Sequence, residues 1–347
     1  MAGKPPRRAI SRLHVACVLL GVIGLTAYSV SKFTPGRAVV VVTAAGLLGF
    51  IFTLGVVALR ARRPVRIALT VVGSLLAVVA GTYLILFPLI ALGQDAIADR
   101  TGAFFQPNSI SEAEAQALAT GGVEPIDLAT PDGDRLRGWL VRNSDAARSP
   151  LLIFFDGSGS QSSAMIPFAR RLSGWSVALV NYRGFGPSTG TPSHANALAD
   201  AALIYDALAR RPDVDGNRIV AMGYSLGTGV AVYLSAERPI AATVLAAPYD
   251  YLTLVGLKQP MLYAPLAGIM HRYFDSISRA PGIHAPLLCL IGANDGAVPP
   301  ERSLNLARSW GGETVVKTYE GEDHGLLFHA NSSWDDIAAF LQRVARE

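Results

Sequence analysis

The sequence predicts an α/β protein with a mostly parallel sheet, helices on both faces of the sheet, and three transmembrane helices in front of it. Two observations predict this fold class. Residues 1–93 contain no Asp or Glu but hold ten of the 30 Lys and Arg. From Val123 onward, short apolar strands alternate with helical segments. This alternation is typical of a parallel sheet that is covered on both faces.

Three apolar runs lie in the N-terminal third, at about residues 13–30, 38–59 and 67–92. They contain 18, 22 and 26 residues, and a helix of roughly 20 residues crosses the hydrocarbon core of a bilayer. We therefore expect residues 1–93 to form a membrane anchor with three transmembrane helices. The open alternatives are a signal peptide followed by two spans, and a buried hairpin.

Basic residues predict the orientation of this anchor, because Lys and Arg are enriched in cytoplasmic loops. Four lie in the N-terminal tail, two in the first loop and four in the second. This pattern places the N-terminus in the cytoplasm and the chain after Leu92 outside it, in a multi-pass protein of the cell (inner) membrane.

Residues 94–347 hold 20 basic and 26 acidic residues, a net charge of −6. No basic patch appears there, so nucleic acid is not expected as a partner.

A linker with a short helix is expected over residues 94–122. Ser111 and Glu114 have the spacing of a capping box, in which each side chain binds the backbone of the other residue. A globular domain follows over residues 123–347. It begins with two strands around the turn Pro-Asp-Gly-Asp, which predicts a hairpin.

The other elements of this domain follow from apolar runs and helical spacing. We expect strands at 149–157, 175–182, 217–224, 241–248, 286–293 and 313–321, and helices at 195–212, 226–239, 300–310 and 332–346. Cys289 is the one cysteine of the globular domain, so no disulfide can form within it.

Ser225 is the candidate nucleophile. It lies in Gly-Tyr-Ser-Leu-Gly, after an apolar strand and before a predicted helix. A Gly-x-Ser-x-Gly sequence alone is a weak signal, but strand, sharp turn and helix form the context that a nucleophile requires. Gly223 and Gly227 leave room for the turn, and the helix N-terminus directs its partial positive charge toward the serine.

A serine needs a base and an acid that orients the base. Asp295 follows the predicted strand 286–293, and His324 follows the strand 313–321. Both therefore stand where open α/β sheets bind ligands. Asp295 could instead be a simple turn residue in Asn-Asp-Gly. Asp250 is the alternative acid, and His329 the alternative base.

Beyond these residues, the chain resembles the α/β-hydrolase superfamily, and within it the membrane-anchored, serine aminopeptidase-like serine hydrolases of bacteria. The resemblance rests on GYSLGTG, NYRGFGPSTGTPS, FDSISRAPGIHAPLLCLIGANDGAVPP and YEGEDH, and it covers about residues 123–347. It implies the α/β-hydrolase fold, a Ser225–Asp295–His324 triad and cleavage of an ester, thioester or amide through an acyl-enzyme. The sequence contains no Cys-x-x-Cys, no His-Glu-x-x-His and no phosphate-binding loop, so we expect no cofactor and no metal.

The resemblance also implies an oxyanion hole formed by the backbone N–H groups of Ser158 and Leu226. The family often has His-Gly-Asn at the first of these places, whereas this chain has Asp156-Gly-Ser. A carboxylate directed at an oxyanion would oppose catalysis by repulsion. We therefore expect Asp156 to turn away from the site, with Arg183 as one candidate partner. For Arg183 itself a purely structural role in a turn is favoured over pairing with Asp156.

A short lid is expected at about residues 251–274, which are rich in Leu, Met, Tyr and Phe. The segment could instead be only the crossover helix, with its apolar face buried on the sheet. If it walls a pocket, the substrate is a small-molecule or lipid-derived acyl ester or thioester, met at the lipid bilayer. A peptidase or amidase, an acyltransferase, and a catalytically silent envelope-binding domain are the alternatives.

Overall fold

The computed structural model describes residues 64–65, 72–74, 104–252 and 272–346. The chain divides into two compact units, Met1–Ala96 with Thr253–His271, and Ile97–Leu252 with Arg272–Glu347. Nearly all of the expected membrane anchor and most of the expected lid lie outside the described residues. Among the described residues, no helix combines the length and the apolar character that a membrane span requires.

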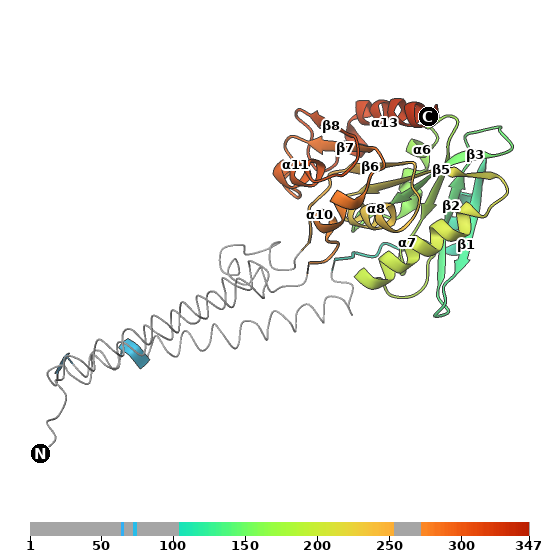
Figure 1. The fold of residues 1–347 in the computed structure, drawn as a ribbon. Coiled ribbons are helices and arrows are strands. Elements are labelled where there is room, and N and C mark those ends of the chain that lie inside the picture. The colour runs from blue at the N-terminus through green and yellow to red at the C-terminus, as the bar shows by residue number, and fades with distance from the viewer. Residues whose placement is uncertain (1–63, 66–71, 75–103, 253–271, 347) are drawn as a thin grey trace, which may run out of the picture. The chain divides into compact units, whose positions relative to one another are not determined.

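An eight-stranded sheet forms the centre of the second unit, in the order β1-β2-β4-β3-β5-β6-β7-β8 (Figure 1). The first two pairs, β1 with β2 and β2 with β4, are antiparallel, and every other pair is parallel. The strands are β1 (Val123–Ala129), β2 (Arg135–Val141), β3 (Ser149–Phe155), β4 (Ser176–Val180), β5 (Val214–Tyr224), β6 (Ala242–Ala246), β7 (Leu287–Gly292) and β8 (Thr314–Tyr319). The expected mostly parallel sheet of an α/β fold is confirmed.

Helices cover both faces of this sheet. One face is packed against α5 (Glu112–Ala117), η2 (Ser162–Met165), α6 (Ile166–Ala169), α12 (Leu326–His329) and α13 (Asn331–Val344). The other helices are α7 (His194–Ala209), α8 (Leu226–Glu237), α10 (Ser276–Arg279), η4 (Ala280–Gly282) and α11 (Pro300–Arg308). Of these, α7, α8 and α11 form the opposite layer, joined through α10.

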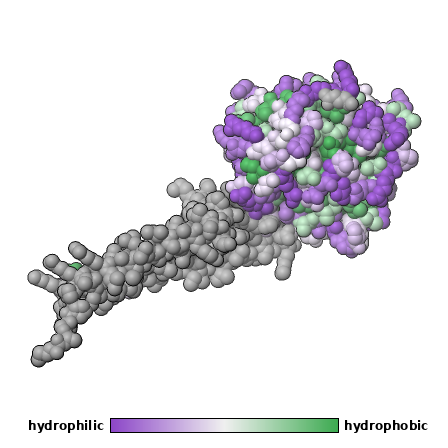
Figure 2. Space-filling model, in the orientation of Figure 1, coloured by the Kyte–Doolittle hydropathy of each residue, from purple (hydrophilic) through white to green (hydrophobic). Residues whose placement is uncertain are grey.

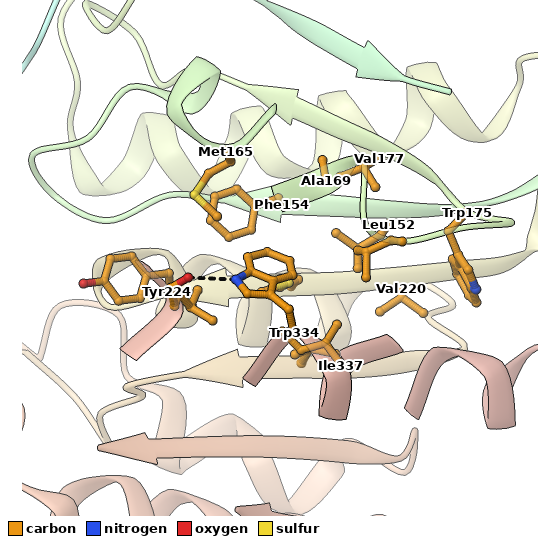
Figure 3. Packing of buried hydrophobic residues seen from close by; sticks show 14 of the residues in the cluster. Leu152, Phe154, Met165, Ala169, Trp175, Val177, Val220, Tyr224, Trp334 and Ile337 are labelled. Carbon is orange, nitrogen blue, oxygen red and sulfur yellow. Dashed lines mark hydrogen bonds between the residues drawn. The ribbon is translucent and has the colours of Figure 1, made fainter. Parts of the chain in front are cut away.

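The core lies between the central strands and these helices. All residues of β3, β6 and β7 are buried, as expected for parallel strands covered on both faces. Figure 3 shows Phe154, Met165 and Trp334 gathered on one face of the sheet. The indole N–H of Trp334 donates a hydrogen bond to the carbonyl of Leu327 at 2.7 Å, so α13 holds α12 in place.

The expected capping box is present at the start of α5. The Ser111 hydroxyl accepts a hydrogen bond from the backbone N–H of Glu114, and the Glu114 carboxylate accepts one from the backbone N–H of Ser111 at 2.8 Å. These two bonds satisfy backbone N–H groups that a helix start leaves without intrahelical partners.

The parallel strands β3, β5, β7 and β8 all end at the same edge of the sheet, so the loops that follow them meet there. In the face shown in Figure 2, polar residues cover most of the described surface, with apolar residues in small groups between them. The loops at the carboxyl edge carry the candidate site.

Candidate active site

Ser225 lies in a sharp turn between β5 and α8. Its φ is +50° and its ψ is −118°, a conformation that costs a non-glycine residue about 1–3 kcal/mol. The backbone N–H of Ser225 donates to the carbonyl of Ala246 at 3.0 Å, which fixes the turn against β6. The side chain is partly exposed. A strained and accessible serine is what a nucleophile elbow requires.

Gly223 and Gly227 allow this turn, because neither position has space for a side chain. A Cβ atom at Gly227 would collide with the backbone carbonyls of Phe155 and Asp156. One at Gly223 would collide with the backbone of Gly227. The two glycines thus let α8 begin in direct contact with the end of β3.

The side chains of Ser225, His324 and Asp295, from three separate loops, form a chain of hydrogen bonds. The hydroxyl of Ser225 lies 2.8 Å from Nε2 of His324, and Nδ1 of His324 lies 2.8 Å from Oδ2 of Asp295. Asp295 follows β7, and its side chain is only 1% exposed, against 28% for His324. The other carboxylate oxygen of Asp295 accepts backbone N–H groups of Ala297 and Val298 at 2.9 and 2.8 Å. These bonds fix the carboxylate and leave Oδ2 for the imidazole.

The alternative acid and base lie in other environments. Oδ1 of Asp250 accepts hydrogen bonds from the Arg302 guanidinium and from the backbone N–H of Tyr251, both at 2.8 Å. His329 has a side chain that is 63% exposed, and its nearest carboxylate is that of Asp323 at 3.7 Å. The structure therefore brings Asp295 and His324 to Ser225.

Of the two residues expected at the oxyanion hole, Leu226 directly follows Ser225 in the chain, and Ser158 lies in the loop after β3. Leu226 is the first residue of α8, so its N–H has no intrahelical acceptor. Ser158 lies in the loop after β3, and its carbonyl accepts a hydrogen bond from the N–H of Gln106 at 2.7 Å. In the same loop, the position of a Cβ atom on Gly157 is 3.7 Å from Cβ of Ser225. The loop therefore passes directly beside the serine.

Aromatic packing fixes the segment that contains Gln106. The preceding residue, Phe105, is buried, with its ring centroid 5.5 Å from that of Tyr182 and 6.2 Å from that of Phe185. The hydroxyl of Tyr182 donates to the carbonyl of Asp156 at 3.0 Å. The loop after β3 is thus held on two sides, by the N–H of Gln106 and by the hydroxyl of Tyr182.

Asp156 does not pair with Arg183, and Arg183 has the structural role that the sequence favoured. Arg183 binds both carboxylate oxygens of Asp200 at 2.9 Å, and it also contacts Asp132 and Asp134 in the β1–β2 turn. Its role is structural, because it ties the hairpin turn to α7. Its hydrogen bonds to Asp200 are the main cause of its raised pKa.

Asp156 is buried and binds its own loop. Its Oδ1 accepts the N–H of Gly157 at 2.7 Å, and the residue is only 1% exposed. Burial raises the pKa of its carboxyl to about 6, and the bond from Gly157 opposes this effect only in part. The carboxyl is therefore held by the loop backbone.

The described part of the chain contains no group of three His, Cys, Asp or Glu side chains placed to hold a metal ion. The arrangement around Ser225 is suited to acyl transfer, because it joins a hydroxyl, an imidazole and a buried carboxylate in one chain of hydrogen bonds.

Sequence reasoning missed Gln106 and the bond of the Tyr224 hydroxyl to the His324 carbonyl at 2.9 Å. Both depend on tertiary contacts that no local pattern signals.

The chain is similar in sequence to known proteins, and in fold to solved structures. Residues 146–278 match the family model described as serine aminopeptidase, S33. The protein MT2364 of Mycobacterium tuberculosis is 37% identical over 225 residues, which cover 63% of this chain and 79% of that protein. The α/β hydrolase domain-containing protein WAV2 of Arabidopsis thaliana is 29% identical over 194 residues, covering 51% of this chain and 63% of WAV2.

Among solved structures, the esterase Pf2001 of Pyrococcus furiosus has the same fold. It superposes with a TM-score of 0.53 at 20% identity, over 69% of this chain and 97% of the esterase chain. Together, the family model, the relatives and the described fold establish that the chain belongs to the α/β-hydrolase superfamily.

Proposed function

We propose that the chain is a membrane-anchored serine hydrolase that cleaves an acyl ester or thioester through an acyl-enzyme. The hydrogen bonds from Asp295 through His324 to Ser225 support this activity best, because nucleophile, base and orienting acid stand in reach of one another without rearrangement. The strained turn at Ser225 is a second support, since strain of this kind is concentrated at functional sites.

In the proposed reaction, Oγ of Ser225 attacks the acyl carbonyl and Nε2 of His324 takes the hydroxyl proton. The carbonyl oxygen becomes an oxyanion, which accepts hydrogen bonds from the N–H groups of Ser158 and Leu226. Collapse of this intermediate breaks the bond to the leaving group, which takes the proton from His324. A water molecule then repeats the sequence on the acyl-enzyme and releases the acid. Throughout, Asp295 holds the Nδ1 proton of His324 and stabilises the imidazolium.

Aromatic side chains near the triad support an apolar substrate. The ring of Tyr224 lies 5.4 Å from that of His324, and the partly exposed Phe328 packs edge-on against Tyr224. The structural similarity to an esterase agrees with an ester substrate. A peptidase or amidase is the second candidate, because the matching family model is named for serine aminopeptidases. An acyltransferase would use the same acyl-enzyme with an acceptor other than water.

A fluorophosphonate probe tests the nucleophile and the acid together. We expect the probe to label the wild-type chain and not a folded Ser225→Ala variant. Asp295→Asn should slow labelling by roughly 10⁴-fold, as in other triads. Asp250→Asn is the matched control, and it should keep the labelling rate because Asp250 binds Arg302 instead. Equal labelling of Ser225→Ala would reject the nucleophile, and a greater loss in Asp250→Asn would reject the acid.

A substrate series tests the acyl preference. We would measure kcat/KM for p-nitrophenyl esters of two to twelve carbons, beside aminoacyl amides. Each CH₂ that enters an apolar pocket contributes up to about 0.8 kcal/mol, or roughly fourfold in kcat/KM. A rise over the short members supports an acyl esterase. A flat or falling series, with faster cleavage of the aminoacyl amides, would favour the peptidase.

We also propose that the hydrolase domain lies outside the cytoplasm in a multi-pass protein of the cell (inner) membrane. The four-against-two distribution of basic residues around the first two apolar runs supports this topology. A reporter that is active only outside the cytoplasm should be active when fused after Gln94 and inactive when fused after Arg63. The reverse pattern would mean an even number of spans.

A further inference from the structure

Tyr224 stands between the loops that carry the candidate site. It is the last residue of β5, directly before Ser225, and it is 6% exposed. Its hydroxyl donates a hydrogen bond to the backbone carbonyl of His324 at 2.9 Å. Its ring centroid lies 5.4 Å from that of the imidazole, with the planes inclined by 35°. The side chain of Tyr224 therefore contacts both the backbone carbonyl and the imidazole ring of His324.

The same ring also contacts the loop after β3. A Cβ atom on Gly157 would lie 3.2 Å from the Cδ1 and Cε1 atoms of Tyr224, so Gly157 lies against that side of the ring. The side chain of Tyr224 thus contacts the loop after β3 and the loop after β8 that carries His324, and it directly precedes Ser225 in the chain. A movement of this ring would shift these two loops relative to Ser225.

The loop that carries His324 is fixed before the histidine by the bond from the Asn294 N–H to the Glu322 carbonyl at 2.9 Å, and at the histidine itself by Tyr224. Within the described part of the chain, the Tyr224 hydroxyl is the one hydrogen-bond donor to the His324 carbonyl. On the far side, Trp334 binds the carbonyl of Leu327 in a similar way (Figure 3). The segment from His324 to His329 is therefore held between a donor from β5 and a donor from α13.

Phe328 completes this support. Its ring packs edge-on against Tyr224 with centroids 5.5 Å apart, and against Phe168 at 6.0 Å. Phe168 in turn stacks on Trp334 at 5.4 Å. Burial is the main cause of the raised pKa of Tyr224, with the nearby carboxylates of Asp156, Asp295 and Asp323 acting in the same direction. The hydroxyl consequently keeps its proton, and can donate it in the hydrogen bond to His324, at every pH at which a Ser-His-Asp triad is active.

We propose that Tyr224 is a positioning residue that sets the distance and angle between Nε2 of His324 and Oγ of Ser225. This role rests on the proposed serine hydrolase function. Its physical basis is that the bonded carbonyl belongs to the histidine itself, so loss of the bond frees the backbone on which the base stands. A displacement of about 1 Å at such a base is enough to cost up to 10²-fold in rate.

Tyr224→Phe tests the role, because it removes the hydroxyl and keeps the ring. Tyr205→Phe in α7 is the matched control. Tyr205 is also buried, at 7% exposure, and its hydroxyl donates to the carbonyl of Pro239 at 2.8 Å, remote from the triad in the fold. Each variant loses one tyrosine-to-carbonyl hydrogen bond, so each is expected to fold and to lose a similar amount of thermal stability.

The second-order rate of fluorophosphonate labelling at Ser225, measured on the full chain, is the first readout. We expect a decrease of about 10-fold to 100-fold in Tyr224→Phe and less than twofold in Tyr205→Phe. With an ester substrate, the loss should appear in kcat and leave KM nearly unchanged. Equal rates in all three proteins would overturn the proposal, and so would an equal decrease in both variants.

The ¹H NMR resonance of the His324 Nδ1 proton is a second readout that needs no activity. A proton bonded to a buried carboxylate resonates at low field, and its exchange with water reports how well the imidazole is held. We expect this resonance to broaden in Tyr224→Phe and to stay unchanged in Tyr205→Phe. An unchanged resonance in Tyr224→Phe overturns the positioning role. If wild-type protein fails to label but this broadening is seen, the hydrolase function fails while the positioning of His324 stands.

Discussion

Asp156 has a raised pKa because its carboxyl group is buried beside Gly157, where water cannot solvate the negative charge. Its pKa of about 6 in the folded protein lies above the ~3.9 of an exposed aspartate. The folded protein therefore binds this proton more tightly than the unfolded chain. The contribution to stability is fully present below about pH 4 and is lost as the pH rises through 6. The difference between the two pKa values corresponds to about 3 kcal/mol at most.

Asp156→Asn should therefore change stability in a pH-dependent way. The amide resembles the protonated carboxyl and carries no charge at any pH, so the variant should be more stable than wild type at pH 7.5. At pH 4.5 the difference should shrink to about one third, because most of the folded protein is then protonated at Asp156. Thermal unfolding of the full chain at both values measures this, with the exposed Asp145→Asn as the control. A difference of the same size at both pH values would contradict the assigned pKa.

At the scale of elements, the contact between β3 and α8 depends on glycine. Gly227→Ala would place a methyl group against the carbonyls of Phe155 and Asp156, and backbone atoms cannot move away as a flexible side chain can. Overpacking of this kind costs about 1–3 kcal/mol and occasionally more. We expect a loss at or above the upper end of this range in the free energy of unfolding. Chemical denaturation of the full chain measures the change.

Gly296→Ala is the control for this prediction. No atom lies within 4 Å of a Cβ at Gly296, and its φ is not positive. Its substitution should change the free energy of unfolding by less than about 0.5 kcal/mol. Similar losses in the two variants would mean that the close approach at Gly227 does not limit stability.

Much of the fold could be predicted because buried parallel strands appear in the sequence as short apolar runs. The three candidate triad residues each follow such a run, so their meeting at one edge followed from strand order. Element ends were less accurate: β5 begins at Val214, where the sequence indicated Asn217, and α7 ends at Ala209, where it indicated Pro212. Partner choice over long distances was not predictable. Arg183 binds Asp200 instead of Asp156 because the fold brings α7 beside the hairpin turn.

At the scale of the whole molecule, residues before the sheet contribute to the candidate site. Phe105 packs on Tyr182, whose hydroxyl holds the Asp156 carbonyl, and Gln106 holds the carbonyl of Ser158. Phe105→Ala should therefore loosen the oxyanion loop and slow labelling of Ser225 by about 10-fold to 100-fold, a part of what a lost oxyanion donor costs. Far-UV circular dichroism should show an intact sheet.

Phe104→Ala provides the comparison. Phe104 is buried to a similar degree, but its ring packs on Tyr273, with centroids 4.7 Å apart. The two truncations remove equal side-chain volume from adjacent residues. Equal slowing in both would mean that the segment acts only through general stability and not through the loop after β3.

The open sheet has a further consequence, for self-association. Its two outer strands, β1 and β8, each have a side with no neighbouring strand in the described sheet, and such a side can pair with another copy of the chain. Pro125 removes one N–H donor from β1. In β8, Lys317 carries a charge and binds Asp336 at 3.0 Å, next to Val316, which is 39% exposed. Lys317→Val would leave Val-Val-Val on an outer strand, and light scattering should then show aggregation at concentrations where wild type stays dispersed.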